Sequence, residues 1–191
     1  SSIESLINNN LEFIRIKEDD KESDSNEWVF AQIFSYPKAN IENTVLMDVK
    51  KDDFKVYKDK RFIVLDTKGN LIGRIIDLGN KSSVVQLINN INNMVMVSDE
   101  KQKIQSALMV PISHNKCKLV GISNQDNISI GDILYTASNS AVYISEIPVC
   151  RVVEIDNSQN SDPFKNVIVE LLSDLRTLNF GVVISSDLKF E

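Results

Sequence analysis

Short runs of β-branched and aromatic residues, separated by Asn, Asp, Gly and Ser, follow one another along most of the chain. No amphipathic helical pattern of useful length separates these runs, and such an arrangement is typical of β-strands joined by turns. It predicts strands over residues 28–36, 42–49, 61–66, 70–78, 82–88, 93–97, 104–112, 116–122, 132–136, 147–156, 166–172 and 181–184. The globular part is therefore predicted to be all-β and to begin at Trp28.

The N-terminal residues have a helical period instead. Positions on one helical face recur at alternating four- and three-residue steps, at Ile3, Ile7, Asn10 and Ile14, with Leu6 and Phe13 beside them. This spacing predicts a helix over residues 1–17 with an apolar seam suited to a coiled coil. A helix this short is marginal alone in water, so it either ends a longer coiled coil or docks on the body of the protein. We expect self-association through the apolar seam residues Ile3, Leu6, Ile7 and Ile14.

A charged stretch without apolar periodicity occupies residues 18–27 and predicts a solvated acidic linker. The predicted strands beyond it form two lists of equal length whose members pair in order. Each half contains an Ile/Val-x-Arg-Ile/Val-Ile/Val-Asp/Glu strand followed by a strand of alternating Val and Ile, so that Gly73-Arg74 corresponds to Cys150-Arg151. A repeat of about 75 residues predicts two small barrels or sandwiches of about six strands, over residues 28–103 and 104–191.

Composition limits the possible functions. The chain has 191 residues, of which 42% are hydrophobic and 25% charged, as in an ordinary folded protein. The net charge of -6 argues against a nucleic-acid partner, because affinity for nucleic acid rests largely on cationic side chains. No apolar run approaches the roughly 20 residues that cross a bilayer, but the chain begins Ser1-Ser2 without Met, so a preceding anchor or signal is not excluded.

The two cysteines, Cys117 and Cys150, lie far apart in the sequence and form no Cys-x-x-Cys pattern. Neither a zinc site nor a disulfide framework is indicated. Two buried core thiols and a mutual disulfide are the remaining alternatives.

Four motifs resemble those of one protein family. Residues 69–85, which contain Gly-Asn-Leu-Ile-Gly-Arg-Ile, are similar to a "D-G-L-V-G-R-V" strand pair, and residues 130–136 to a "V-G-D-x-V-x-T" motif. Residues 147–152 resemble "I-P-V-G-x-V", and residues 174–184 resemble a closing "D-L-x-x-L-x-x-V-x-V". The family is that of the rod shape-determining protein MreC, and the resemblance runs in register over residues 28–184.

The sequence departs from this family pattern at two places. Residues 137–146 lack the usual Gly-rich turn with Phe-Pro, and Cys150 replaces a usual Gly. Because Gly supplies positive φ angles in such turns, either Asn139 adopts that conformation or the loop has a different shape.

The resemblance implies a single-pass protein of the inner (cytoplasmic) membrane, with a membrane anchor in the full-length protein. Residues 1–191 would form a coiled-coil helix and two β-barrels in the periplasm or extracytoplasmic space. The barrels would be similar to those of chymotrypsin-like proteases without the active site, and no catalytic residue, cofactor or metal is implied. The implied role is a scaffold of the cell-wall elongation machinery that maintains cell shape. Its implied partners are further copies of itself, a penicillin-binding transpeptidase and other cell-shape membrane proteins.

Two rival functions follow from the same architecture. A chymotrypsin-like protease needs a nucleophile, a His base and a carboxylate between its barrels, but the only histidine, His114, lies in a polar turn and no Gly-rich oxyanion turn is present. Its location at the predicted junction keeps this rival open. A periplasmic adaptor of an export system would need split halves of a lipoyl-like unit around the helix, and nothing before Trp28 supplies one.

Three residues are candidates for partner binding. Tyr36, Tyr143 and Ile144 could act as exposed anchors, since aromatic and aliphatic side chains dominate interface energetics. The alternative is that they belong to the core. For Trp28 and Phe62 we expect a core location, because both lie within strand patterns.

Overall fold

The computed structural model describes residues 27–35, 43–156 and 163–188. Every predicted strand has a counterpart there, and the one helix in the described residues is the 3-10 turn η1 (Lys51–Asp53). The strands are β1 (Glu27–Ser35), β2 (Thr44–Met47), β3 (Lys60–Leu65), β4 (Leu71–Leu78), β5 (Ser83–Leu87), β6 (Val95–Ser98), β7 (Ala107–Pro111), β8 (Lys116–Val120), β9 (Ile133–Thr136), β10 (Pro148–Asp156), β11 (Asn166–Leu171) and β12 (Phe180–Asp187). The predicted helix over residues 1–17 lies outside the described residues, and so does the predicted linker over 18–27 except for Glu27, which begins β1.

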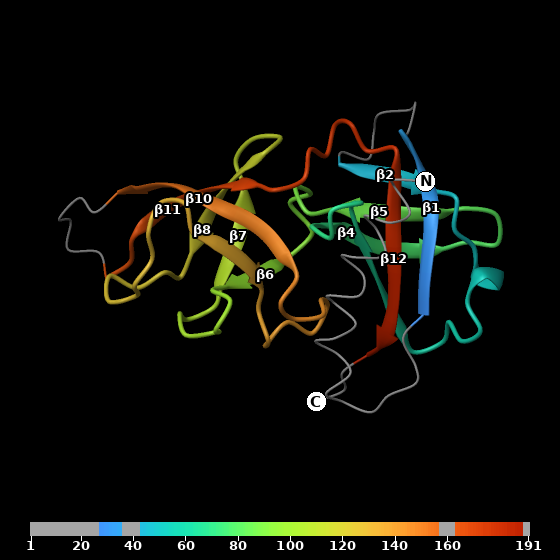
Figure 1. Cartoon of the computed structure of the whole chain (residues 1–191), viewed down its shortest axis with the longest axis horizontal. Helices are drawn as coiled ribbons and strands as arrows, with labels where there is room; N and C mark the ends of the chain where they lie inside the picture. The colour runs from blue at the N-terminus through green and yellow to red at the C-terminus, as the bar shows by residue number, and fades with distance from the viewer. Residues whose placement is uncertain (1–26, 36–42, 157–162, 189–191) are drawn as a thin grey trace.

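The strands form two closed antiparallel barrels that lie side by side along the long axis of the molecule (Figure 1). The first has the order β1-β12-β3-β4-β5-β2 and the second has the order β10-β11-β8-β7-β6-β9. Closure pairs both edges of every strand, which removes the open edges that invite aggregation. The prediction of an all-β protein with two six-stranded barrels is confirmed.

The predicted division of the strands between the barrels is wrong at two strands. Strand β6 was expected in the first barrel but pairs with β7 and β9 in the second. Strand β12 was expected in the second but lies between β1 and β3 in the first (Figure 1). The second barrel is thus a continuous segment inserted between β5 and β12, so a single boundary between residues 103 and 104 does not separate the two sheets.

The internal repeat predicted from the sequence is present, with its irregularities. Strand β4 bulges at Ile72 against β3 and at Ile76 against β5, because these two residues have no direct partner in the register. Strand β10 bulges at the equivalent residues, Val149 against β9 and Val153 against β11. The same two bulges at the same spacing place Gly73 and Cys150 at matching positions in the two barrels.

Each barrel has an apolar interior. That of the first consists of Ala31, Ile33, Met47, Val49, Phe54, Phe62, Val64, Ile72, Val85, Leu87 and Val183. The apolar cluster of the second barrel does not end at its own strands, because it includes residues on the outer face of the first, namely Ile63, Leu65, Leu71, Ile88 and Ile184. The two barrels therefore share a buried apolar interface. Phe62 lies in the core as expected, and Trp28 is half-buried against the shared cluster.

The loop over residues 137–146 has a different shape from one that turns at Asn139, which is the second of the two alternatives considered for its missing glycines. Asn139 does not adopt a positive φ, whereas Glu146 does, with φ of 67°. Its backbone N–H donates to the carbonyl oxygen of Thr136 at 3.0 Å, which closes the loop before β10. The loop therefore turns at Glu146 and not at Asn139.

Candidate binding surfaces

The junction between the barrels, where a protease would hold its catalytic groups, is filled by structural contacts. Arg61 of β3 donates from Nε to Ser186 Oγ at 2.7 Å and from Nη1 to the carbonyl oxygen of Tyr143 at 3.1 Å. Ser173, in the segment that returns the chain to the first barrel, donates to Asp66 Oδ2 at 2.7 Å. The bonds to Tyr143 and from Ser173 join the first barrel to segments outside it, whereas the bond to Ser186 links β3 to β12 within the first barrel. Arg61 therefore ties the loop that carries Tyr143 to the first barrel.

Tyr143 is buried and does not fit the expectation of an exposed partner-binding anchor. Its side chain is 1% exposed, and its hydroxyl donates to Asn93 Oδ1 at 2.8 Å. Burial raises the pKa of this phenol, so the group stays protonated as a hydrogen-bond donor. Its neighbour Ile144 is half-buried against the same core, and its carbonyl oxygen accepts a bond of 2.6 Å from Thr136 Oγ1.

His114, the single histidine of the chain, is exposed in the turn between β7 and β8. Its backbone is hydrogen-bonded to the loop before β6, because the carbonyl oxygen of His114 accepts a hydrogen bond of 3.1 Å from Asn89 Nδ2. Among the described residues, no group of three or more His, Cys, Asp or Glu side chains is placed to hold a metal ion. The geometry around His114 is that of a surface turn.

Cys117 and Cys150 are both buried in the second barrel as free thiols. Of the two alternatives, core thiols and a disulfide, the structure has the first. Burial raises the pKa of Cys117 to about 12 and also raises that of Cys150.

We expect neither thiol to react with an alkylating reagent in the native protein, because the thiolate is the reactive form and both groups are covered. Counting labelled thiols by mass spectrometry at neutral pH should give none in buffer and two in guanidinium chloride. The unfolded chain, with ordinary thiol pKa values near 9.0, ionises first as pH rises, so the native state should lose stability between about pH 9 and pH 12. Labelling of either cysteine at the rate of a free thiol would contradict the burial.

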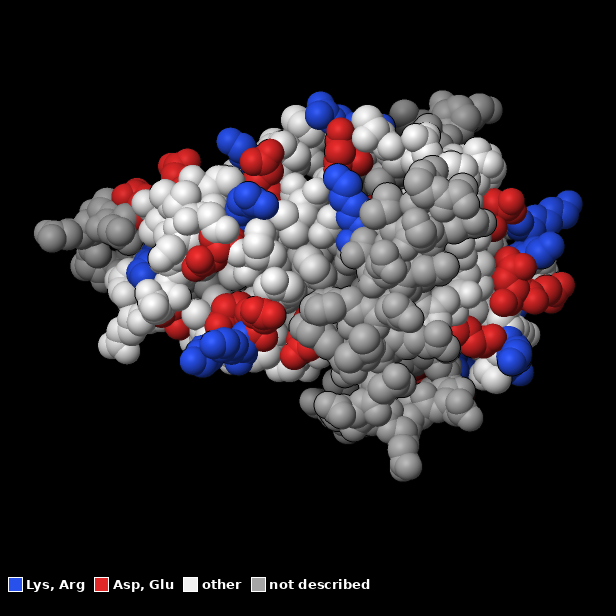
Figure 2. All heavy atoms as spheres, in the orientation of Figure 1, with Lys and Arg blue, Asp and Glu red and all other residues white. Residues whose placement is uncertain are grey.

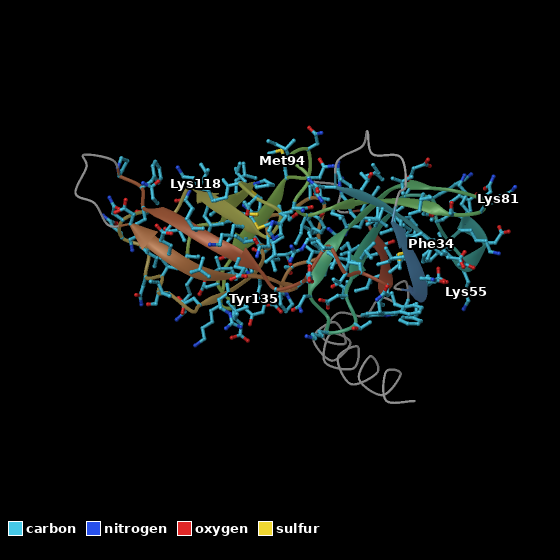
Figure 3. The ribbon with its side chains drawn as sticks, turned by 90° about the horizontal axis from the view of Figure 1, so that it is seen from above. Phe34, Lys55, Lys81, Met94, Lys118 and Tyr135 are labelled. Atoms are coloured by element: carbon cyan, nitrogen blue, oxygen red, sulfur yellow. The ribbon has the colours of Figure 1, made fainter. Side chains whose placement is uncertain are left out.

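A partly exposed apolar surface lies on the outside of the second barrel. It consists of Met94, Leu108, Val110, Ile112 and Val120, with Lys118 among them, and is called the second-barrel face below. Cross-strand pairing sets Leu108 beside Val120 and Val110 beside Lys118. The side chains of Met94, Ile112 and Val120 are 63%, 56% and 51% exposed. Met94 and Lys118 lie on one side of the barrel and Tyr135 on the other (Figure 3).

A second exposed apolar group lies on the outside of the first barrel, on β1 and β12. It consists of Phe30, Phe34 and Phe180, called the aromatic face below. The rings of Phe30 and Phe180 stack with their centroids 5.3 Å apart and an interplanar angle of 13°. All three side chains remain more than 40% exposed.

Charged side chains of both signs are mixed on the face of the molecule drawn in Figure 2. Lys and Arg lie beside Asp and Glu on both barrels on the face in Figure 2. Such mixing gives no broad field of one sign to steer a polyanion. The apolar faces are therefore the features of this surface best suited to specific binding.

The remaining predicted site residues, Ile3, Leu6, Ile7, Ile14 and Tyr36, lie outside the described residues. Neither the second-barrel face nor the aromatic face was predicted from the sequence. A signal for both was present, because β7 and β1 carry apolar residues at consecutive positions, whereas a strand with one wet face alternates.

Comparison with known proteins agrees with this architecture. A family model described as rod shape-determining protein MreC, barrel core, matches residues 35–185. No curated protein sequence matches the chain.

Several solved structures are similar to the chain. MreC from Pseudomonas aeruginosa superposes with a TM-score of 0.70 at 16% identity, covering 82% of this chain and 98% of that one. MreC from Listeria monocytogenes gives a TM-score of 0.67 at 17% identity, covering 99% and 92%. A structure of the complex between penicillin-binding protein PBP2 and MreC from Helicobacter pylori gives 0.59 at 15% identity, covering 86% and 100%. The last of these shows that an MreC of this fold binds a penicillin-binding protein.

Proposed function

The chain belongs to the family of the rod shape-determining protein MreC, and from that membership we propose that it is a non-catalytic scaffold of the bacterial cell-wall elongation machinery. The inter-barrel junction supports the non-catalytic part, since Arg61, Ser186 and the carbonyl oxygen of Tyr143 fill it with structural hydrogen bonds. A scaffold acts by holding partners together, so its function resides in its binding surfaces.

The observation that carries the partner part of the proposal is the second-barrel face. In a closed barrel, neighbouring strands pair the hydrogen-bonding groups of the backbone, so no strand edge is left to bind a partner. Apolar side chains clustered on the outer side of the barrel are stabilised when a partner removes them from water. We propose that a penicillin-binding transpeptidase occupies this face. The complex between PBP2 and MreC from H. pylori supports a penicillin-binding protein as the partner. Lys118 within the apolar cluster favours an acidic side chain on the partner.

Val120→Glu tests this assignment. The glutamate places a carboxylate within the second-barrel face, opposite Leu108, and we expect the affinity for the penicillin-binding protein of the same organism to fall about tenfold or more. Surface plasmon resonance with the two purified extracytoplasmic parts measures the change. Ile130→Glu is the matched control, because Ile130 is 66% exposed in the loop before β9, outside the second-barrel face. Equal affinities of the two variants would assign the interface elsewhere.

We further propose that the protein self-associates through the predicted N-terminal seam and that a membrane anchor holds it at the outer side of the cytoplasmic membrane. The described residues include no helix with the length and hydropathy of a membrane span. The anchor is proposed from family membership, and other cell-shape membrane proteins are proposed as further partners.

Ile7→Asp with Ile14→Asp tests the seam. The two residues lie two helical turns apart on one face, so the charges enter a contact that depends on removing apolar side chains from water. We expect sedimentation analysis to show weaker self-association of the chain with its natural upstream sequence, beside an unchanged β circular dichroism spectrum. The same distribution of oligomers in wild type and variant would leave contacts between barrels as the route to assembly.

A further inference from the structure

The aromatic face is the outer side of the two strands that begin and end the described chain. Strands β1 and β12 lie side by side on the first barrel (Figure 1). In their register Phe30 is opposite Val182, and Gln32 is opposite Phe180. The alternate residues of β1 that point inward, such as Ala31 and Ile33, are buried in the core. The exposed phenylalanines are therefore on the water side of a well-formed strand pair.

This face continues a surface that is already covered. Val182 and Ile184 are on the same side of β12 as Phe180 and are 2% and 0% exposed, and Ile184 packs into the cluster shared with the second barrel. On the same side of the strand pair, Phe180 is 42% exposed and its stacking partner Phe30 is 47% exposed. The rings of Phe30 and Phe180 stack, and Phe34 lies on the same side of β1 as Phe30, whereas most exposed apolar residues of proteins are scattered singly.

The N-terminal sequence contains a segment whose apolar stripe fits such a face. A two-stranded coiled coil needs apolar residues at two positions of each heptad, which Ile3, Ile7 and Ile14 supply. Leu6 and Phe13 add a third position to each heptad. A stripe of that greater width is typical of a helix packed on the body of a globular protein.

The connection is long enough and short enough for this contact. Residues 15–26 separate Ile14 from the start of β1 and span at most about 40 Å when extended. Phe30 lies only three residues into β1. A short flexible tether gives the segment an effective concentration in the millimolar range at its own barrel, which favours contact within the chain over contact between dilute copies.

We infer that the N-terminal apolar segment over residues 3–14 docks as a helix on the aromatic face of its own chain. The docked segment covers Phe30, Phe34 and Phe180 and gives the short helix the partner that it needs. The inference rests on the seam proposed above for self-association. It implies that docking regulates self-association, because the seam residues cannot contact a second copy while they contact the aromatic face.

Disulfide trapping in the whole chain tests the docking. Gln32→Cys places a thiol on the aromatic face between Phe30 and Phe34, and Asn10→Cys places one at the centre of the predicted stripe without removing an apolar side chain. Asn8→Cys is the matched control, because residue 8 lies on the opposite side of the same helix. The native Cys117 and Cys150 are buried and do not compete.

Under mild oxidation at micromolar protein, we expect the pair of residues 10 and 32 to form an intrachain disulfide several-fold faster than the pair of residues 8 and 32. Adding Phe30→Ser with Phe180→Ser should lower that rate several-fold and should expose the backbone amides of residues 3–14 to faster hydrogen exchange. Equal rates for the two pairs, disulfides only between copies, or exchange unchanged by the serine substitutions would each overturn the docking. Self-association is read separately by the sedimentation of Ile7→Asp with Ile14→Asp, so the two proposals can fail independently.

Discussion

Val152→Asp is expected to prevent the second barrel from folding. Val152 is fully buried in the apolar cluster and lies opposite Val169 of β11. A carboxylate there has no cationic partner in the cluster, and burying it costs several kcal/mol, which is a large part of the roughly 5–15 kcal/mol that stabilises a domain. We expect the near-ultraviolet circular dichroism signal to be lost and unfolding to occur at a lower urea concentration than in the wild type.

Two further aspartates serve as comparisons for this variant. Val120→Asp makes the same change on the water side of the same barrel, where the side chain is 51% exposed, and should cost about 1 kcal/mol or less. Ile75→Asp occupies the position equivalent to Val152 in the first barrel, but its side chain is half-buried and can turn its carboxylate toward water. The loss of stability in Ile75→Asp should fall between the losses in the other two variants. A Val152→Asp protein as stable as Val120→Asp would mean that β10 is out of register by one residue.

The strands could be predicted from the sequence because their signal is local. Alternation in a strand such as β8, where Cys117 and Leu119 are buried while Lys116, Lys118 and Val120 are exposed, is visible within five residues. The repeat was visible for the same reason, since bulges and turns recur at fixed spacing. Membership of the barrels was not, because β12 pairs with β1, far away in the sequence, and nothing within either strand specifies that partner.

The binding surfaces were harder to predict for a related reason. Tyr143 was a candidate for an exposed anchor because it is aromatic, but its hydroxyl donates to Asn93 Oδ1, fifty residues earlier. A buried position of this kind is set by a long-range contact that local composition does not indicate. In β7, by contrast, the run Ala-Leu-Met-Val-Pro lacks any polar residue, and this local signal for an apolar outer side was present but not used.

Gly73→Ala is expected to be strongly destabilising, although it adds a single methyl group. A Cβ on Gly73 would lie 2.3 Å from the carbonyl oxygen of Gln86 and 3.1 Å from Val85 Cγ1. The oxygen belongs to the backbone of β5, so it moves away only if the pairing of β4 with β5 opens. Overpacking of a core at the upper end of the usual range costs about 3 kcal/mol, and we expect at least that loss in urea unfolding.

The repeat supplies the control for this variant. Cys150 occupies the matching position in the second barrel, between the same two bulges, and already carries a Cβ within a fully buried site. Cys150→Ala only removes the sulfur atom, so it should cost about 1–2 kcal/mol and leave the pairing of β10 intact. A Gly73→Ala protein no less stable than Cys150→Ala would mean that β4 and β5 approach less closely than the register requires. If Gly73→Ala is the less stable of the two, the pairing of β4 with β5 in the first barrel requires a glycine. The equivalent pairing in the second barrel accommodates a larger residue, Cys150.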